Sequence, residues 1–544
     1  MGKPTLVLSF LVTMSLSVVR CASAKIIHVP DDYPTIQQAI DRALDGDTVL
    51  VDPGDYPEII DFKRKAIRVT SSRGPWMTVI DGDYRWGGVI FFQSGEQKNS
   101  ILDGFTITRA SGQHATGIIC YSSSPTITRN LIVNNYAGDD LVYVFHGSPT
   151  FTDNVFKANG WGLVIDAQES TITSSGDTFE DSHASYGYGV VAHLSRSTAS
   201  FHDDVFADSV SGEGGAIHAE ASSLLFDHCI IQHNSAGMDG GFLACFDSTV
   251  SLNRCLLSGN RAYGKGGAIY CVGQASSAAV TLTSCVFAHN GSFDSGGAVY
   301  LGPHSSAVIS SCTFFENRAP SGDSITCQDA ATTAITSSIL WGGSAGREIA
   351  EGSSLVTAAY CDVAGGWPGP GNIDADPLLV APEQGDFSLA TVSPCIDAGD
   401  PWARPGGMDV QGSPRTLDGA LIGHLALDMG AAEFDHVHLA STPFVAGETA
   451  TLHTSGTPGL TVLLVVGTRT GETPLPPLGA LFIDLGSAWA FSILGTIPPA
   501  EAFDVQVRVP PGLLVPLPIV LQEIAIQPAG RAGNTSSAID LVLE

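Results

Sequence analysis

The sequence is poor in positive charge. It carries 25 lysine and arginine residues against 55 aspartate and glutamate residues, which gives a formal net charge of −30 at pH 7. Such a chain repels phosphate backbones and anionic lipid surfaces, so we expect neither a nucleic-acid nor a membrane partner. The excess of acidic residues suits a soluble surface in an extracellular medium. We expect no cofactor, although the acidic residues leave Ca²⁺ binding as an alternative.

Long apolar runs are missing as well. The apolar stretch from Leu6 to Val19 follows Lys3 and is too short to cross a bilayer as a helix. It ends just before the small residues 22–24, a combination typical of a cleaved secretory signal. We therefore predict a signal peptide over residues 1–24, no transmembrane segment after its removal, and a secreted or cell-surface protein.

A coiled coil or a helical array is excluded, because the chain repeats itself at irregular steps of roughly 26 residues. Each repeat holds short alternations such as Thr126-Ile127-Thr128, which are typical of half-buried β-strands. Variable steps are natural where loops of different length join such strands, so each repeat is predicted to form one coil of a parallel β-helix. One apolar position is expected to stack into an interior ladder, formed by Phe105, Ile132, Phe156, Phe179, Phe206, Ile231, Leu257, Phe287, Phe314 and Leu340.

Three further positions recur with the repeat. Cysteines stand two residues before the ladder position, where alternation directs them inward: Cys229, Cys255, Cys285 and Cys312. Asparagines stand three residues after it, where they tolerate left-handed backbone and can bond one another through their amides: Asn135, Asn159, Asn234, Asn260, Asn290 and Asn317. Glycine pairs predict tight bends before the next strand, at 214–215, 240–241, 266–267 and 296–297.

The ends of the repeat need covers, because an open β-helix exposes sheet edges. Apolar residues at helical spacing predict a capping helix near residues 34–44, followed by a strand at 48–51. The β-helix is expected to span residues 25–360, and an irregular segment over 361–435 to close it. Residues 440–544 alternate as short strands between turns and predict a β-sandwich. The predicted fold is all-β: a right-handed single-stranded parallel β-helix with an N-terminal capping helix, followed by a C-terminal antiparallel β-sandwich.

Several segments resemble known families. The line from Pro34 to Ile40, with residues 46–51 and 53–56, resembles the capping helix and first strand of the pectin-lyase-like right-handed parallel β-helix superfamily. The GGA(I/V) and FxxN tetrapeptides, seen at 214–217, 266–269 and 296–299 and at 156–159, 287–290 and 314–317, are similar to repeats of polymorphic outer-membrane proteins, which are surface adhesins. Residues 376–379, 385–389, 393–399 and 428–434 are similar to the choice-of-anchor Q closing segment of bacterial surface proteins. The last strand lacks the terminal aromatic of an autotransporter barrel, so that part of the second resemblance fails.

The catalytic motifs of polygalacturonases and pectate lyases are missing as sets. The resemblance to the superfamily places catalysis on an outer face of the helix, with spaced carboxylates or Ca²⁺ beside a base. Asp139 and Asp140 form the one paired acid that we consider as a catalytic candidate, against the alternative of a solvated loop. The fifteen histidines show no fixed short spacing, so no metal site is predicted.

The strands that follow the glycine bends offer a better candidate. Alternation directs Ile217, Leu243, Ile269 and Val299 inward together with Ala219, Cys245, Cys271 and Leu301, and directs His218, Ala244, Tyr270 and Tyr300 toward solvent. Glu213, Asp239 and Lys265 stand at equivalent positions before successive bends. Stacked tyrosines flanked by acids could hold a sugar ring, whereas the alternative is an aromatic stack beside an Asp239–Lys265 surface pair.

The cysteines are expected to be mostly free, buried thiols, because in-register parallel strands direct neighbouring side chains the same way. Cys361 and Cys395 are the one disulfide suggested, at the closure. For function, a glycan-binding or adhesive surface protein without a catalytic motif is the first hypothesis. A polysaccharide lyase or glycoside hydrolase acting on acidic polysaccharides is the second, and a structural envelope spacer is the third. The sequence leaves the oligomeric state open.

Overall fold

The computed structural model describes residues 24–434 apart from residues 86, 113–116, 139, 161, 185–186, 344–346, 404–407, 414 and 416–425, and beyond 434 it describes the strands between residues 437 and 543. The predicted signal peptide lies outside the described residues except for its last residue. Within the described part, the search for a helix long and apolar enough to cross a membrane finds none.

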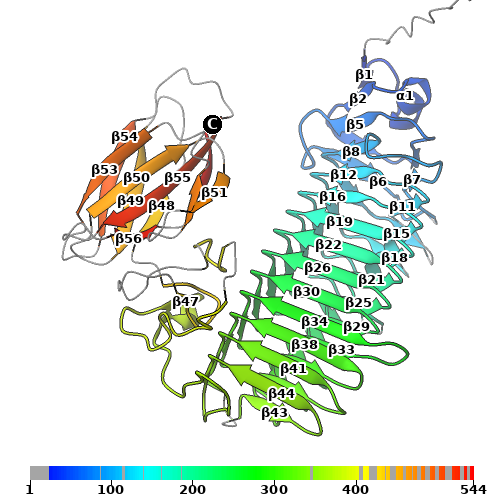
Figure 1. Ribbon diagram of the computed structural model, residues 1–544. Coiled ribbons are helices and arrows are strands. Elements are labelled where there is room, and N and C mark those ends of the chain that lie inside the picture. Colours follow the sequence, from blue (N-terminus) through cyan, green and yellow to red (C-terminus); the bar gives the residue numbers. More distant parts are fainter. Residues whose placement is uncertain are drawn as a thin grey trace, which may run out of the picture.

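Most of the described chain winds into a right-handed parallel β-helix (Figure 1). Three long parallel sheets run along it, and each complete coil adds one strand to each sheet. Sheet A has 14 described strands: β1 (Ile26–Val29), β2 (Thr48–Val51), β5 (Arg68–Ser71), β8 (Ile101–Asp103), β12 (Thr126–Thr128), β16 (Thr150–Thr152), β19 (Thr171–Ser175), β22 (Thr198–His202), β26 (Ser223–Asp227), β30 (Thr249–Asn253), β34 (Ala278–Thr283), β38 (Ser305–Ser310), β41 (Thr332–Thr336) and β44 (Leu355–Ala359).

Sheet B has 13 described strands: β3 (Gly54–Tyr56), β6 (Thr78–Asp81), β9 (Thr106–Thr108), β13 (Leu131–Val133), β17 (Val155–Lys157), β20 (Thr178–Glu180), β23 (Val205–Ala207), β27 (Ile230–Gln232), β31 (Leu256–Ser258), β35 (Val286–Ala288), β39 (Thr313–Phe315), β42 (Ile339–Trp341) and β45 (Asp362–Val363). Sheet C has 12: β4 (Ile60–Asp61), β7 (Ile90–Phe92), β11 (Ile118–Tyr121), β15 (Asp140–Phe145), β18 (Leu163–Gln168), β21 (Ala192–Ser195), β25 (Ile217–Glu220), β29 (Leu243–Phe246), β33 (Ile269–Val272), β37 (Val299–Leu301), β40 (Ile325–Cys327) and β43 (Ile349–Glu351).

Short strands pair at the corner that leads from sheet B to sheet C. They are β10 (Ser111–Gly112) with β14 (Tyr136–Ala137), and β24 (Val210–Ser211), β28 (Ser235–Ala236), β32 (Arg261–Ala262) and β36 (Gly291–Ser292) in one four-stranded sheet. At the first coil, helix α1 (Ile36–Arg42) begins after Thr35, whose side chain accepts a hydrogen bond from the Gln38 backbone. Its buried residues include Ile36 and Ile40, which confirms the predicted capping helix.

The interior ladder forms as predicted except at its first member. Ile132, Phe156, Phe179 and Phe206 pair in register, and the rings of Phe156 and Phe179 stack with centroids 4.8 Å apart. Ile132 pairs with Ile107, so the predicted place of Phe105 in this ladder is wrong. Phe105 instead stands at the preceding corner, where Gly104 takes the left-handed conformation and the Phe105 backbone N–H donates to Asn130.

The asparagine ladder also forms, with a different backbone conformation from the one predicted. The backbone N–H and side-chain amide of Asn234 both donate to Asn260 Oδ1, and the same pattern continues from coil to coil. The left-handed residue of each corner is the one before the asparagine, such as His233 before Asn234 and Gly259 before Asn260. The asparagine thus turns into the coil and satisfies buried backbone groups that the corner leaves unpaired.

Beyond the last coil, the chain turns back along the β-helix. The closing segment, residues 364–434, contains β46 (Leu379–Ala381), the short helix η1 (Pro382–Gln384) and β47 (Asp386–Leu389). Phe387 and Ala431 pack against Val286 and Phe315, which point outward from sheet B. The segment therefore covers the outer face of sheet B in addition to the end of the helix, where Trp367 packs on the main core.

The C-terminal part forms antiparallel sheets, as the predicted sandwich requires. One sheet has β48 (Val437–Ser441), β49 (Thr449–Gly456) and β54 (Ala502–Arg508). A second has β53 (Ala490–Thr496), β50 (Thr461–Gly467), β55 (Leu517–Ile526), β56 (Ala532–Thr535) and β57 (Ile539–Leu543). A two-stranded ribbon pairs β51 (Thr470–Pro474) with β52 (Ala480–Ile483), and β48 of the first sheet lies against β55 of the second.

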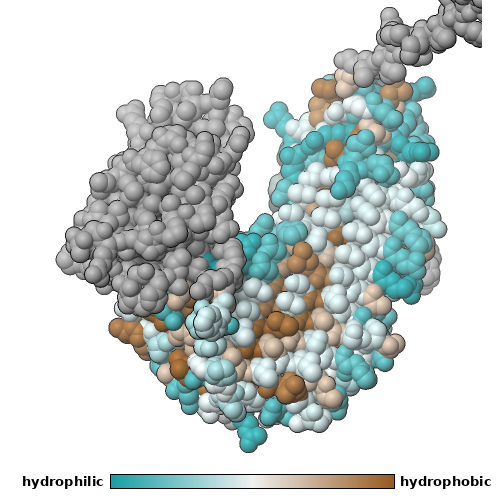
Figure 2. Space-filling model, in the orientation of Figure 1, coloured by the Kyte–Doolittle hydropathy of each residue, from teal (hydrophilic) through white to brown (hydrophobic). Residues whose placement is uncertain are grey.

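The β-helix surface is mostly weakly polar on the side that Figure 2 shows, with an apolar strip over its middle and later coils. Outward positions of sheet A are largely serine and threonine, such as Thr198, Ser223 and Thr249 on successive coils. The charged residues of this sheet pair with one another, as Arg68 does with Asp103.

Candidate functional site

The outer face of sheet C gathers the predicted site residues. Strand pairing aligns His218, Ala244, Tyr270 and Tyr300 in one outward column, and their strand neighbours Ile217, Leu243, Ile269 and Val299 are buried in the core as predicted. The expectation that the whole column faces solvent is wrong, because His218 and Tyr300 are each 2% exposed and Ala244 is 0% exposed. Neighbouring rings of the same face cover them, so the column is a packed surface with few accessible edges.

The two tyrosines form the predicted shelf. The rings of Tyr270 and Tyr300 stack with centroids 5.3 Å apart and planes 9° apart. The Lys265 ammonium lies 4.7 Å from the centre of the Tyr300 ring and 3.3 Å from its hydroxyl. That hydroxyl donates to Gln328 Oε1 at 3.2 Å, so the shelf is tied to the next coils. Burial, followed by the charge of Asp239, raises the pKa of Tyr270, which therefore stays neutral.

Glu213, Asp239 and Lys265 are equivalent residues in three coils, as the repeat predicts. The Gly214 and Gly240 backbone N–H groups donate to the carbonyls of Asp239 and Lys265 respectively. Burial and the neighbouring Asp239 raise the pKa of Glu213 to about 7, and burial raises that of Asp239. Asp239 Oδ1 accepts the backbone N–H of Lys265 at 2.7 Å, while the Lys265 ammonium lies over Tyr300.

The glycine bends are what allow this face to pack so closely. Gly240 has a φ of +68°, and a Cβ there would lie 2.3 Å from the Leu243 carbonyl oxygen. A Cβ on Gly241 would lie 2.0 Å from the carbonyl oxygen of Gly267 in the next coil. A side chain at Gly240 would clash within its own coil, and one at Gly241 would separate its coil from the next one, which carries Tyr270.

An exposed aromatic pair lies at the corner beside the shelf, and sequence reasoning missed it. Tyr263 and Phe293 are 63% and 59% exposed, and their rings stack with centroids 5.1 Å apart. The Arg261 guanidinium lies 6.0 Å from the Phe293 ring. Both aromatics stand three residues after an asparagine of the ladder, Asn260 and Asn290, so the coil period could have revealed them.

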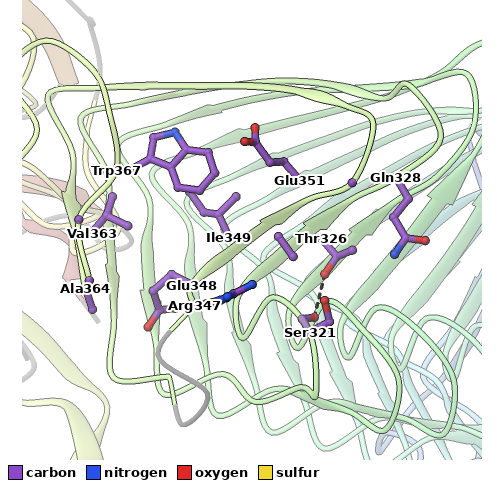
Figure 3. A pocket seen from close by; sticks show the side chains of 14 residues that line it. Ser321, Thr326, Gln328, Arg347, Glu348, Ile349, Glu351, Val363, Ala364 and Trp367 are labelled. Atoms are coloured by element: carbon purple, nitrogen blue, oxygen red, sulfur yellow. Dashed lines mark hydrogen bonds between the residues drawn. The ribbon is translucent and has the colours of Figure 1, made fainter.

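A cavity of about 590 Å³ continues this face toward the end of the helix (Figure 3). Gln328, which accepts from Tyr300, is one of its lining residues. Arg347 and Glu351 bring opposite charges to the same wall, and Trp367 of the closing segment borders the cavity. The shelf and the cavity thus share Gln328 and form one continuous surface.

A second group lies on the earlier coils of sheet C, where His218, a predicted ligand-binding residue, meets His193 and Glu220, which the sequence analysis did not connect with it. His193 Nδ1 lies 2.8 Å from Asp166 Oδ1, and His218 Nε2 lies 3.2 Å from Glu220 Oε1. The hydrogen bond to Asp166 raises the pKa of His193, whereas burial lowers that of His218. One potential metal-ligand atom each from His193, His218 and Glu220 lie within 4.8 Å of one another. The sequence does contain a sign of this grouping: His193 and His218 are 25 residues apart, which equals one coil. Short spacings between histidines do not reveal it.

Of the remaining predicted site residues, Asp140 also belongs to sheet C, and its charge is one of the smaller contributions that raise the pKa of His193. Asp139 lies outside the described residues, and Asp140 begins β15 beside Leu163, at an earlier coil. The suggested disulfide is not formed: Cys361 and Cys395 are both free thiols. The reason is that Cys361 is buried in the main core, whereas Cys395 lies in the separate closing cluster and its Sγ donates to Asp362. The ten described cysteines are all buried and unpaired, as expected of small apolar side chains.

Comparison with known proteins agrees with the fold. Residues 172–359, which extend from β19 to β44, match the sequence model of the family described as a right-handed β-helix region. No curated protein matches the chain. Among solved structures, pectate lyase Pel9A is similar over 76% of this chain and 97% of its own, with 13% identity and a TM-score of 0.31. Tailspike protein 2 from Escherichia coli O157:H7 bacteriophage CAB120 is similar over 93% of this chain and 65% of its own, with 9% identity and a TM-score of 0.30. The finer resemblances to polymorphic outer-membrane proteins and choice-of-anchor Q segments stay predictions.

Proposed function

We propose that this chain is a secreted or cell-surface glycan-binding protein, and that the glycan lies on the outer face of sheet C from the Tyr263–Phe293 pair to the cavity at Trp367. The observation that carries the proposal is the shared Gln328, which joins the tyrosine shelf to the cavity. A cavity of about 590 Å³ is within the usual range for small-ligand sites. Because Tyr300 is only 2% exposed, the accessible rings on the same side are those of Tyr263 and Phe293.

The chemistry of the lining suits sugars. Flat aromatic rings contact the apolar faces of pyranose rings, and charged side chains bond hydroxyl groups strongly. Tyr263 and Phe293 offer two accessible rings, and Lys265, Arg347 and Glu351 offer charged partners. The two cations would also attract a carboxylate on an acidic sugar, in a molecule whose net charge otherwise repels one.

Retention of the purified chain on immobilised pectin, alginate, chondroitin and neutral polysaccharides tests the proposal. We expect Tyr263→Ala and Phe293→Ala to weaken retention about tenfold each, and Tyr300→Phe to weaken it less, since it removes only the hydroxyl bonds to Lys265 and Gln328. Tyr121→Ala is the matched control, because this exposed tyrosine of sheet C lies on an early coil. If Tyr263→Ala and Phe293→Ala left retention unchanged, the proposed glycan-binding face would be wrong. If the wild-type protein were retained on no glycan, the hypothesis of a structural spacer would be favoured.

A second function, glycoside hydrolysis, is favoured by the acid pair of the bends. Glu213 has a pKa of about 7 and is one coil from Asp239, so a proton donor stands beside a second carboxyl group. Acid catalysis of glycoside cleavage uses such a raised pKa together with a second carboxylate. New reducing ends that disappear in Glu213→Gln while retention persists would establish this function, and an unsaturated product would indicate a lyase instead.

A further inference from the structure

The His193, His218 and Glu220 cluster has no role in the glycan platform proposed above. It lies on β21 and β25, at coils that precede the tyrosine shelf. Its two imidazoles face each other with centroids 5.6 Å apart, and the rings of Tyr188 and Phe246 flank His218 at 4.6 Å and 5.0 Å. Titratable groups from three neighbouring coils thus meet in one place.

We propose that His193, His218 and Glu220 bind one divalent transition-metal ion of the Zn²⁺ class, with Asp166 orienting His193. Two imidazoles and a carboxylate are a ligand set that such ions take, whereas Ca²⁺ prefers oxygen ligands alone. Two ligands of a tetrahedral Zn²⁺ ion lie about 3.4 Å apart. His218 Nε2 is 3.2 Å from Glu220 Oε1, and the ligand atoms of all three residues lie within 4.8 Å of one another.

The surroundings of His193 match those of a metal ligand. Its Nδ1 is engaged by Asp166, which leaves Nε2 for a metal, and Gln168 in turn donates to the other oxygen of Asp166. A carboxylate on the far nitrogen of a ligating histidine fixes the ring and strengthens the ligand. Asp166 is itself buried, so the pair is held rigidly before any ion arrives.

His218 is buried beside the proposed site. It is 2% exposed, and its Nδ1 is buried with no hydrogen-bond partner among the described residues. A buried nitrogen without a partner costs about 1–3 kcal/mol of stability. The nitrogen that faces the proposed site is Nε2, which lies 3.2 Å from Glu220 Oε1, and the unpartnered Nδ1 lies on the other side of the ring.

The site is also open to solvent on one side and carries negative charge to balance a cation. The Glu220 side chain is 55% exposed, so an ion reaches the cluster from solvent on that side. Asp166 and Glu220 together supply two negative charges to offset those of a divalent cation. Three protein ligands leave a fourth position of a tetrahedral ion for water or for a donor atom of another molecule.

Titration of the full-length, chelator-stripped protein with ZnCl₂ by calorimetry tests the proposal, with CoCl₂ as an optical probe. We expect wild type to bind one equivalent and to give the visible absorption of tetrahedral Co²⁺. His193→Gln should lose that equivalent and that absorption, and Glu220→Gln should weaken binding at least tenfold. Asp166→Asn should weaken it about 10–100-fold without changing the thermal midpoint of the metal-free protein.

The second His and Glu cluster of the described chain supplies the matched control. His289, Glu316 and Glu383 also offer ligand atoms within 4.8 Å, but at distances of 3.8 Å and on an exposed surface. His289→Gln should leave the bound equivalent and the Co²⁺ spectrum unchanged. Absence of binding to wild type, or binding that is lost in His289→Gln and kept in His193→Gln, would overturn the proposal.

Discussion

At the scale of single residues, the least expected feature is a pair of aspartates inside the β-helix wall. Asp177 and Asp204 occupy the corner position that cysteine holds in later coils, and both are 0% exposed. The Asp177 backbone N–H donates to Asp204 Oδ1, while Asp204 Oδ2 has no partner among the described residues. Burial, with the charge of Asp177, raises the pKa of Asp204 to about 7, and burial raises that of Asp177 to about 6.

We predict that Asp204→Asn stabilises the protein at pH 8. A carboxyl with a raised folded pKa favours the folded state when protonated, so its contribution is lost as pH rises from about 4 in the unfolded chain toward about 7 in the folded one. An asparagine carbonyl keeps the bond from Asp177, as Asn154 does for Asn130 at the same corner position two coils earlier. The gain should be about 1–3 kcal/mol.

Urea unfolding at several pH values from 4 to 8 measures this effect. The wild-type free energy of unfolding should fall across that range, and the fall should be smaller in Asp204→Asn. Asp208→Asn, at an exposed aspartate four residues away, should leave the profile as it is. A variant that is less stable than wild type at pH 8 would contradict the assignment of Asp204 as a buried, strained carboxyl.

At the scale of elements, polar ladders hold the corners between sheets. Beside the asparagine ladder, a serine ladder that sequence reasoning missed runs along the corner from sheet C to sheet A. Each serine hydroxyl accepts the backbone N–H of the serine one coil earlier, as Ser222 does for Ser197 and Ser248 for Ser222. These bonds satisfy buried N–H groups that tight corners leave outside the strand pairing, so the side-chain ladders and the sheets stabilise the same stacking.

Substitution of Asn260 tests the ladder. Asn260→Ala removes the acceptor for both donors of Asn234 and the donor to the Ile231 carbonyl. We expect a loss of about 2–4 kcal/mol, since buried polar groups stay unpaired. Asn260→Ser should lose less, because Ser209 stands in this same ladder and serine hydroxyls accept coil-to-coil N–H groups at the other corner. Denaturant midpoints rank the two variants, and an equal loss in both would mean that shape rather than hydrogen bonding matters here.

At the scale of the whole molecule, the sequence predicted the coil period and the capping helix, and it missed how side chains pack between coils. Local alternation and the repeat reveal the coil period, the inward residues and the equivalence of Glu213, Asp239 and Lys265. Stacking of the coils then brings equivalent residues into contact. The cover over His218 and Tyr300 and the grouping of Asp166 with His193 depend on ring packing between coils. The path of the closing segment depends on contacts such as Arg415 with Ser284, 131 residues apart, for which no local pattern exists.

Arg415 fastens that closing segment to the β-helix. Its side chain is 2% exposed, its Nη1 donates to Glu433 at 2.6 Å, and its Nη2 donates to Ser284 Oγ and the Ser311 carbonyl. The two serines stand at the same corner of successive coils. One guanidinium thus links two coils to the segment and offsets the charge of Glu433, whose carboxyl has a pKa raised by burial.

We predict that Arg415→Met loosens the closing segment and lowers stability by about 3–5 kcal/mol at pH 8, because it leaves Glu433 buried without its cation. The loss should be smaller at pH 5, where protonation of Glu433 removes the uncompensated charge, and Glu433→Gln in the same chain should recover part of it. Thermal midpoints and the rate of limited proteolysis within residues 376–434 measure both effects. Arg318→Met, at an exposed arginine paired with Glu316, should change neither. Equal losses at both pH values, with no recovery in the double variant, would mean that Arg415 acts through packing alone.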